Sequence, residues 1–130
     1  MTSGFDITVI ENAVIDAIYA LNVSKNVFAN RPASSTRDLA DFVVCQVSGG
    51  VFDRAALGEC AFSISLFAKD VSNMKNSKKL SVMEQKIRNG LAYEIGKIVF
   101  KPYTYRVIGD TSDGNGYSVR MVTIQAFLKR

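Results

Sequence analysis

The sequence contains no histidine and no tryptophan, and only two cysteines and two prolines. Because histidine is the commonest general base and metal ligand, its absence excludes Ser–His–Asp triads and Cys–His nucleophile pairs. Cys45 and Cys60 are too few for a disulfide framework or a zinc site, so we expect two small core thiols in a reducing compartment. No apolar run approaches the ~20 residues that a membrane helix requires, and we expect no contact with a membrane.

Other marks of catalysis and export are missing too. The twelve acidic residues show no paired spacing on one predicted face. Neither glycine-rich stretch, at residues 48–50 or 114–116, lies between a strand and a helix with a following Lys-Ser or Lys-Thr, as a P-loop would. We therefore expect no enzyme, no metal and no cofactor. The first 22 residues hold three acids and no Lys or Arg, which is atypical of a secretory signal peptide.

What is present is typical of one folded domain over residues 1–130, with 48% hydrophobic and 22% charged residues. The net charge of +4 is unevenly distributed: residues 1–60 hold four Lys or Arg against seven acids, and residues 61–130 hold twelve against five. Such asymmetry favours a nucleic-acid or acidic protein partner. The plainer interpretation is that long basic side chains simply solvate an outer helix face and the sheet edges.

Two segments have helical periodicity. In residues 6–21 the apolar side chains form one stripe (Ile7, Ile10, Val14, Ala17, Ile18 and Leu21), and Asp6 is a good N-cap. A second helix follows from the spacing of Leu80, Met83, Ile87 and Leu91. Its first residue is open between Asn73, Ser77 and Ser81, and Gly90 marks its end.

The remaining apolar segments indicate strands. A short extended piece covers residues 26–29, and residues 42–47 and 60–69 form two strands that pair antiparallel. Ser48-Gly49-Gly50 is expected to end the first of these, and residues 93–102 are ambiguous. Residues 103–111 and 117–128 form a hairpin around the turn at 112–116. Both faces of its last arm are partly apolar, which predicts cover on both sides by its own domain or by another subunit.

These elements follow the order α-β-β-β-α-β-β. Two helices with a mainly antiparallel sheet predict an α+β fold, arranged as a two-layer sandwich.

The order and its landmarks resemble the phage tail-terminator and tail-completion proteins. The landmarks are the first helix, Asn26-Val27-Phe28, Arg31-Pro32, the strand at residues 62–68, the helix at 79–89 and a hairpin with a long second arm. The resemblance implies a structural virion protein without catalytic residues. It implies a ring, commonly a homo-hexamer, that caps the tail tube and joins it to the neck or head side. The expected partners are the major tail tube protein and a neck or connector protein, with DNA passing through the ring lumen. The expected location is the virion tail, with assembly in the host cytoplasm.

Candidate contacts with partners lie in the two polar loops, along the second helix and, in one case, in the last strand. They are Arg37, Asp38, Lys75, Lys78, Lys79, Lys86, Asp113, Asn115 and Arg120. The alternative function is a small basic nucleic-acid-binding domain. Aromatic residues on predicted strands stand near Arg106 and Arg120, and sheet aromatics can stack on bases. Contact through phosphates would be the expected mode of binding.

Overall fold

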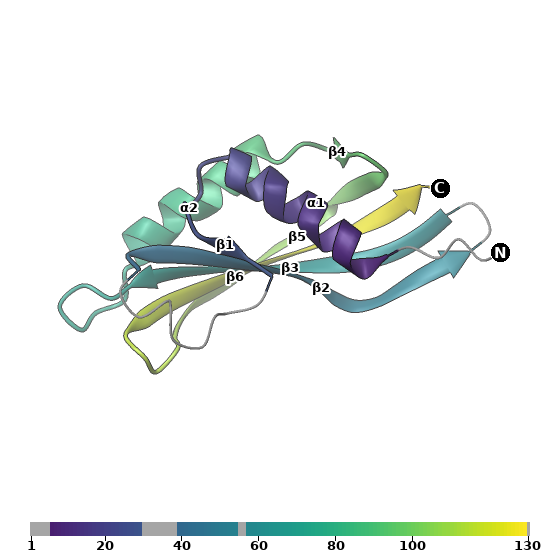
Figure 1. Cartoon of the computed structure of the whole chain (residues 1–130). Coiled ribbons are helices and arrows are strands. Elements are labelled where there is room, and N and C mark those ends of the chain that lie inside the picture. Colours follow the sequence, from purple (N-terminus) through teal and green to yellow (C-terminus); the bar gives the residue numbers. More distant parts are fainter. Residues whose placement is uncertain (1–5, 30–38, 55–56, 130) are drawn as a thin grey trace.

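The computed structural model describes residues 6–29, 39–54 and 57–129, and of residues 48–54 and 57 it describes the backbone only. The elements in chain order are α1 (Ile7–Ala20), β1 (Val27–Phe28), β2 (Asp41–Arg54), β3 (Leu57–Lys69), α2 (Ser77–Gly90), β4 (Glu94–Ile95), β5 (Ile98–Ser112) and β6 (Tyr117–Lys129). They form a mixed α/β fold with two helices and one sheet (Figure 1).

The six strands lie in the order β1-β2-β3-β6-β5-β4. Among the described strands, β1 pairs parallel to β2, and the other pairs are antiparallel. The sheet curls into a half-barrel, where a two-layer sandwich was expected, because long strands twist and coil. Both helices lie on the same face of the sheet (Figure 1). The expected order of elements lacked one strand, β4, which follows α2 in the chain.

Helix α1 begins and ends as its sequence predicts. The Asp6 carboxylate accepts a hydrogen bond from the backbone N–H of Thr8 at 2.8 Å, which is the N-cap contact. Ile10, Val14 and Ile18 are buried. The helix closes at Asn22, whose φ of 58° lies in the left-handed region that asparagine tolerates.

Helix α2 buries the predicted stripe and begins at Ser77, one of the three residues left open for its start. Leu80, Met83 and Ile87 are buried beneath it. The N-cap is the preceding residue, Asn76, which the sequence pattern did not single out. The Asn76 side-chain oxygen accepts from the Lys79 N–H at 3.3 Å, and its side-chain nitrogen donates to the Lys69 carbonyl at 3.1 Å. The same side chain therefore caps the helix and ties it to the end of β3.

Strands β2 and β3 pair antiparallel along most of their length. Phe62, Ile64 and Leu66 of β3 alternate into the core beneath the helices, as the sequence predicts. The predicted break at Ser48-Gly49-Gly50 is wrong, because β2 continues to Arg54. Instead, the pairing with β3 shifts register between Ser48 and Phe52. The two glycines lie at this irregularity, and the pairing resumes after it.

The two apolar faces of β6 belong to two different clusters. Val122, Ile124, Ala126 and Leu128 are buried on the helix side. On the opposite face, Tyr117 packs edge-on against Phe42, with ring centroids 5.2 Å apart, and Phe42 stacks on Phe67 at 4.3 Å. Farther along this face Met121, Thr123 and Phe127 are only half-buried. The chain itself therefore covers one face fully and the other in part.

Strand β5 begins before its predicted start at residue 103. It runs from Ile98 to Ser112 and includes Pro102. Strand β4 pairs only with its first two residues. Proline is tolerated here because the rest of β5 is an outer strand, where a missing N–H breaks no ladder. The register against β6 shifts twice, between Lys101 and Arg106 and between Ile108 and Thr111. The second shift places Asp110 in a bulge.

Candidate interaction surfaces

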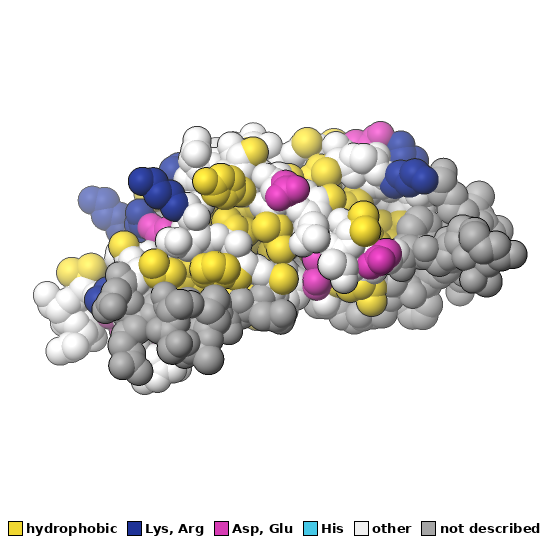
Figure 2. Space-filling view, viewed as in Figure 1, with side chains coloured by type: hydrophobic (Ala, Val, Ile, Leu, Met, Phe, Trp, Pro, Cys, Tyr) yellow, Lys and Arg dark blue, Asp and Glu magenta, His cyan; other side chains and the backbone are white. Residues whose placement is uncertain are grey.

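The four predicted contact lysines lie on α2 or directly before it. Lys75 precedes α2, and Lys78, Lys79 and Lys86 lie on it, all four exposed. Lys and Arg side chains gather where α2 begins, whereas carboxylates lie along α1 (Figure 2). Helix α2 thus carries four of the twelve Lys and Arg residues in the second half of the sequence, namely Lys78, Lys79, Lys86 and Arg88.

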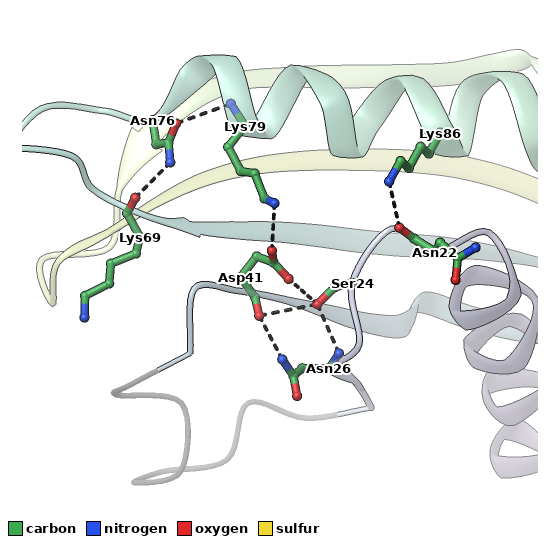
Figure 3. Close-up of polar contacts among 8 residues, drawn as sticks. All are labelled: Asn22, Ser24, Asn26, Asp41, Lys69, Asn76, Lys79 and Lys86. Atoms are coloured by element: carbon green, nitrogen blue, oxygen red, sulfur yellow. Dashed lines mark hydrogen bonds and ion pairs between the residues drawn. The ribbon is translucent and has the colours of Figure 1, made fainter.

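Lys79 is part of a polar cluster that joins α2 to the start of β2 (Figure 3). Its ammonium lies 3.1 Å from the Asp41 carboxylate, whose other oxygen accepts from the Ser24 hydroxyl. The Asn26 side chain donates to the Asp41 carbonyl at 3.2 Å, and the Asn26 N–H donates to Ser24 Oγ at 3.0 Å. The Asp41 side chain is 16% exposed, so Lys79 has a mainly structural partner.

The other lysines differ in how far they are engaged within the chain. Lys86 Nζ donates to the Asn22 carbonyl at 3.0 Å, which connects α2 to the end of α1 (Figure 3). Lys75 Nζ donates to the Asp110 carbonyl at 3.2 Å. Lys78 makes no hydrogen bond or ion pair with the residues that the structure describes. Each ammonium has three donors, so Lys75 and Lys86 keep donors for a partner as well.

Arg120 is engaged by the β5 bulge. Its Nε and Nη2 donate to the two oxygens of Asp110 at 2.6 and 3.0 Å, and its Nη1 donates to Ser81 Oγ at 3.1 Å. The two side chains are 15% and 12% exposed. The hydrogen bonds from Arg120 hold the pKa of Asp110 below its usual value. This side chain therefore fixes the bulge and α2 to β6.

The predicted loop contacts fall partly outside the described residues. Arg37 and Asp38 both lie outside them. At the β5–β6 tip, Asp113 Oδ1 accepts from the N–H groups of Asn115 and Tyr117 at 2.7 and 3.0 Å. Gly114 and Gly116 have positive φ, as the turn chemistry predicts. Asp113 thus shapes the tip, and Asn115 is exposed on it.

A buried carboxylate on α2 was not recognised as a site from the sequence. Glu84 is 2% exposed; its oxygens lie 2.9 and 3.0 Å from the Arg88 guanidinium, and Tyr105 Oη donates to it at 2.7 Å. Burial, and then the hydrogen bond to Glu84, raise the pKa of Tyr105. The available signal was the spacing, since Glu84 stands on the same helix face as Leu80 and Ile87.

An apolar pocket of about 260 Å³ lies between the end of α2 and β5. Its lining consists of Ile87, Arg88, Leu91, Ala92, Tyr93, Phe100, Pro102, Tyr105 and Ile124. The one charged group among these residues, Arg88, is paired with Glu84. Such a lining suits an apolar side chain or small apolar molecule and offers no converging polar groups for chemistry.

The two cysteines lie in the core on the helix side of the sheet. Cys45 is fully buried and Cys60 is 6% exposed. Burial raises the pKa of Cys45 to about 12, with a further contribution from Glu11, and raises that of Cys60 to about 11. Within the described residues there is no cluster of three or more His, Cys, Asp or Glu that could hold a metal ion. Nor do they include a helix of the length and apolarity that a bilayer crossing demands.

Comparison with known proteins gives a likeness of fold. No protein-family model and no curated protein matches the sequence. A solved structure known only by a reference number is 9% identical, with a TM-score of 0.58 over 95% of this chain and 92% of its own. A chain from the virion of a native gene transfer agent particle is 10% identical, with a TM-score of 0.53 over 87% of this chain and 84% of its own. At these identities the likeness shows a shared fold.

Proposed function

We propose that the protein is a structural component of a phage virion, and more specifically a ring-forming tail terminator or tail-completion protein. The observation that carries the proposal is the fold likeness to a chain of a gene transfer agent virion, a phage-like particle, over most of both chains. The landmarks that resemble the tail-terminator family point the same way. The fold alone does not assign a role, so the assembly must be tested directly.

The proposed assembly is a homo-oligomeric ring, commonly a hexamer, on the end of the tail tube. One side of the ring would contact the major tail tube protein, and the other a neck or connector protein, with DNA passing through the lumen. The half-covered second face of β6 and the open outer edge of β5 are surfaces of the kind that subunit contacts bury. The protein would act in the virion tail after assembly in the host cytoplasm.

Light scattering during size exclusion and electron microscopy test the ring. We expect a species of about six times the 14.2 kDa chain mass, with ring-shaped particles. Mixed with isolated tail tubes, the protein should bind at one tube end. A chain that is strictly monomeric and ignores tail tubes at all concentrations would contradict the proposal.

The hairpin tip allows a sharper test of tube binding. Asn115 is exposed at the β5–β6 turn, so Asn115→Arg should weaken binding to the tube without changing the mass of the oligomer. Lys97→Glu, at an exposed residue outside the proposed contacts, is the control and should bind normally. Equal binding by both variants would remove the tip from the contact surface.

The second candidate is a nucleic-acid-binding domain that uses the basic face of α2. The exposed Lys78 and the remaining donors of Lys75 and Lys86 favour it. Titration of duplex DNA at two salt concentrations separates the candidates. Binding through several phosphates would lose affinity steeply with salt, whereas a terminator ring that only surrounds DNA should bind it weakly at both concentrations.

A further inference from the structure

The outward surface of α1 is apolar and acidic. It consists of Val9, Asn12, Asp16 and Tyr19, which we call the α1 face. Val9 is 65% exposed and Tyr19 is 55% exposed, although both are large hydrophobic residues. Asp16 is exposed and pairs with no residue that the structure describes. The helix carries no Lys or Arg at any position, so nothing on it neutralises this charge.

The outward surface of α2 has the opposite charge. It consists of Lys78, Val82, Gln85, Lys86 and Asn89, which we call the α2 face. Val82 is 49% exposed at its centre, with lysines four residues to either side, so the three side chains share one stripe. A shallow hollow runs along this face beside Ser81, Val82 and Asn89. The acid on this helix, Glu84, points inward and is paired with Arg88.

We propose that the α1 face of one copy docks on the α2 face of a second copy. The inference rests on the proposed self-assembly and names the surfaces that make it. In the contact, Tyr19 covers Val82, and Asp16 approaches the flanking Lys78 and Lys86. Both helices have 14 residues, or about 21 Å, so the two faces match in length.

Charge complementarity selects a second copy over nucleic acid as the occupant. A phosphate backbone would neutralise the lysines but would leave Val82 in water, and it would be repelled by Asp16 on the neighbouring helix. The α1 face supplies an anion and two exposed apolar side chains at once. Burying both apolar surfaces against each other is favourable, and the opposite charges set the register.

The contact is head to tail because the two faces are different. Each copy offers its α1 face to one neighbour and its α2 face to the next. Repeated contacts of this kind close into a ring when the rotation between copies allows it. The α1–α2 contact is therefore of the type that a terminator ring needs.

Charge reversal and its rescue test the contact in the full chain. Lys78→Glu with Lys86→Glu should raise the dissociation constant of self-association at least about tenfold, measured by analytical ultracentrifugation. Asp16→Lys should have a similar effect. The triple variant, with both helices reversed, should recover association, because it restores opposite charges across the contact. Tyr19→Ala, at an exposed position, should also weaken association.

The control carries the same change in net charge elsewhere. Lys25→Glu with Lys97→Glu alters two exposed lysines outside both faces and should associate as the wild type does. An oligomer unaffected by the face variants, or one that the triple variant does not restore, overturns the contact while leaving the terminator proposal standing. Association that depends on these charges but forms no ring and binds no tail tube supports the contact and overturns the terminator role. A wild type that is strictly monomeric and ignores tail tubes at all concentrations overturns both.

Discussion

At the scale of residues, the Arg120–Asp110 pair shows how one side chain holds several elements. Arg120→Leu should lower the free energy of unfolding at neutral pH by about 2–3 kcal/mol, because it leaves the poorly exposed Asp110 carboxylate without its partner. Urea denaturation monitored by circular dichroism measures the loss. Arg106→Leu, at an exposed residue on β5, the strand of Asp110, is the control and should change stability little.

The pair also predicts a pH dependence with a definite sign. The pKa of Asp110 is lower in the folded chain than its usual value. Its contribution to stability is therefore fully present above the unfolded pKa and is lost as the pH falls through the folded pKa. The stability difference between wild type and Arg120→Leu should shrink as the pH falls below 3.8, the usual pKa of an aspartate. A difference that is constant with pH would show that packing, and not charge, accounts for it.

The cysteines give a second prediction at this scale. The native protein should resist a thiol reagent at about pH 8, since Cys45 and Cys60 are buried and their pKa values are raised to about 12 and about 11. Both thiols should react once urea unfolds the chain. Colorimetric thiol counting gives the result, and rapid reaction of either thiol in the native protein would contradict the burial.

At the scale of elements, the first irregularity of β5 depends on one hydroxyl. Thr104 Oγ1 donates to the Lys101 carbonyl at 2.6 Å and accepts from the Gln125 N–H at 2.9 Å. Thr104→Val keeps the shape but removes both bonds, at a cost of about 1–2 kcal/mol. The Gln125 amide should then exchange hydrogen faster, as measured by NMR. Thr123→Val, a half-buried position with no such pair of bonds, is the control.

The sequence predicted correctly those elements in which one face is buried, because the apolar residues of such an element repeat regularly. Helix α1 and strand β3 are confirmed because their apolar residues repeat at the period of one element. The start of α2 was not determined, because several Asn and Ser residues can all cap a helix. The cap, Asn76, also bonds to Lys69 at the end of β3, a contact that helical periodicity does not reveal. The full length of β2 and the presence of β4 could not be predicted without knowing the neighbouring strands. Hydrogen bonds to a neighbour can keep a strand extended even where it contains glycines.

The sequence predicted which residues form the candidate surfaces, but it did not predict which other residues they contact. The run of lysines near α2 was visible in the sequence, as was its amphipathic pattern. Whether a given lysine is free depends on residues far along the chain, such as Asp41 for Lys79 and Asn22 for Lys86. Likewise Arg120 meets Asp110 only because a bulge in β5 turns that residue toward it.

At the scale of the whole molecule, the centre of the sheet should be its most stable part. Strand β3 is paired on both sides, with β2 and β6, and its core residues are fully buried. Native-state hydrogen exchange should therefore be slowest at Ile64, Leu66 and Val122, at rates set by global unfolding. The amides of residues 103–109, on the outer strand, should exchange by local opening. Equal protection of the amides of residues 103–109 and those of Ile64, Leu66 and Val122 would contradict this ranking.

The two register shifts between β5 and β6 have a consequence for how the fold can vary in length. Between Lys101 and Arg106, β5 has more residues than the facing part of β6, and the surplus forms an irregularity in the outer strand. A residue gained or lost there changes the size of the irregularity and leaves the pairing on either side in place. The same change in β3, between two partners, would turn every following side chain to the wrong face. Homologues should therefore differ in length along β5 and keep β3 constant.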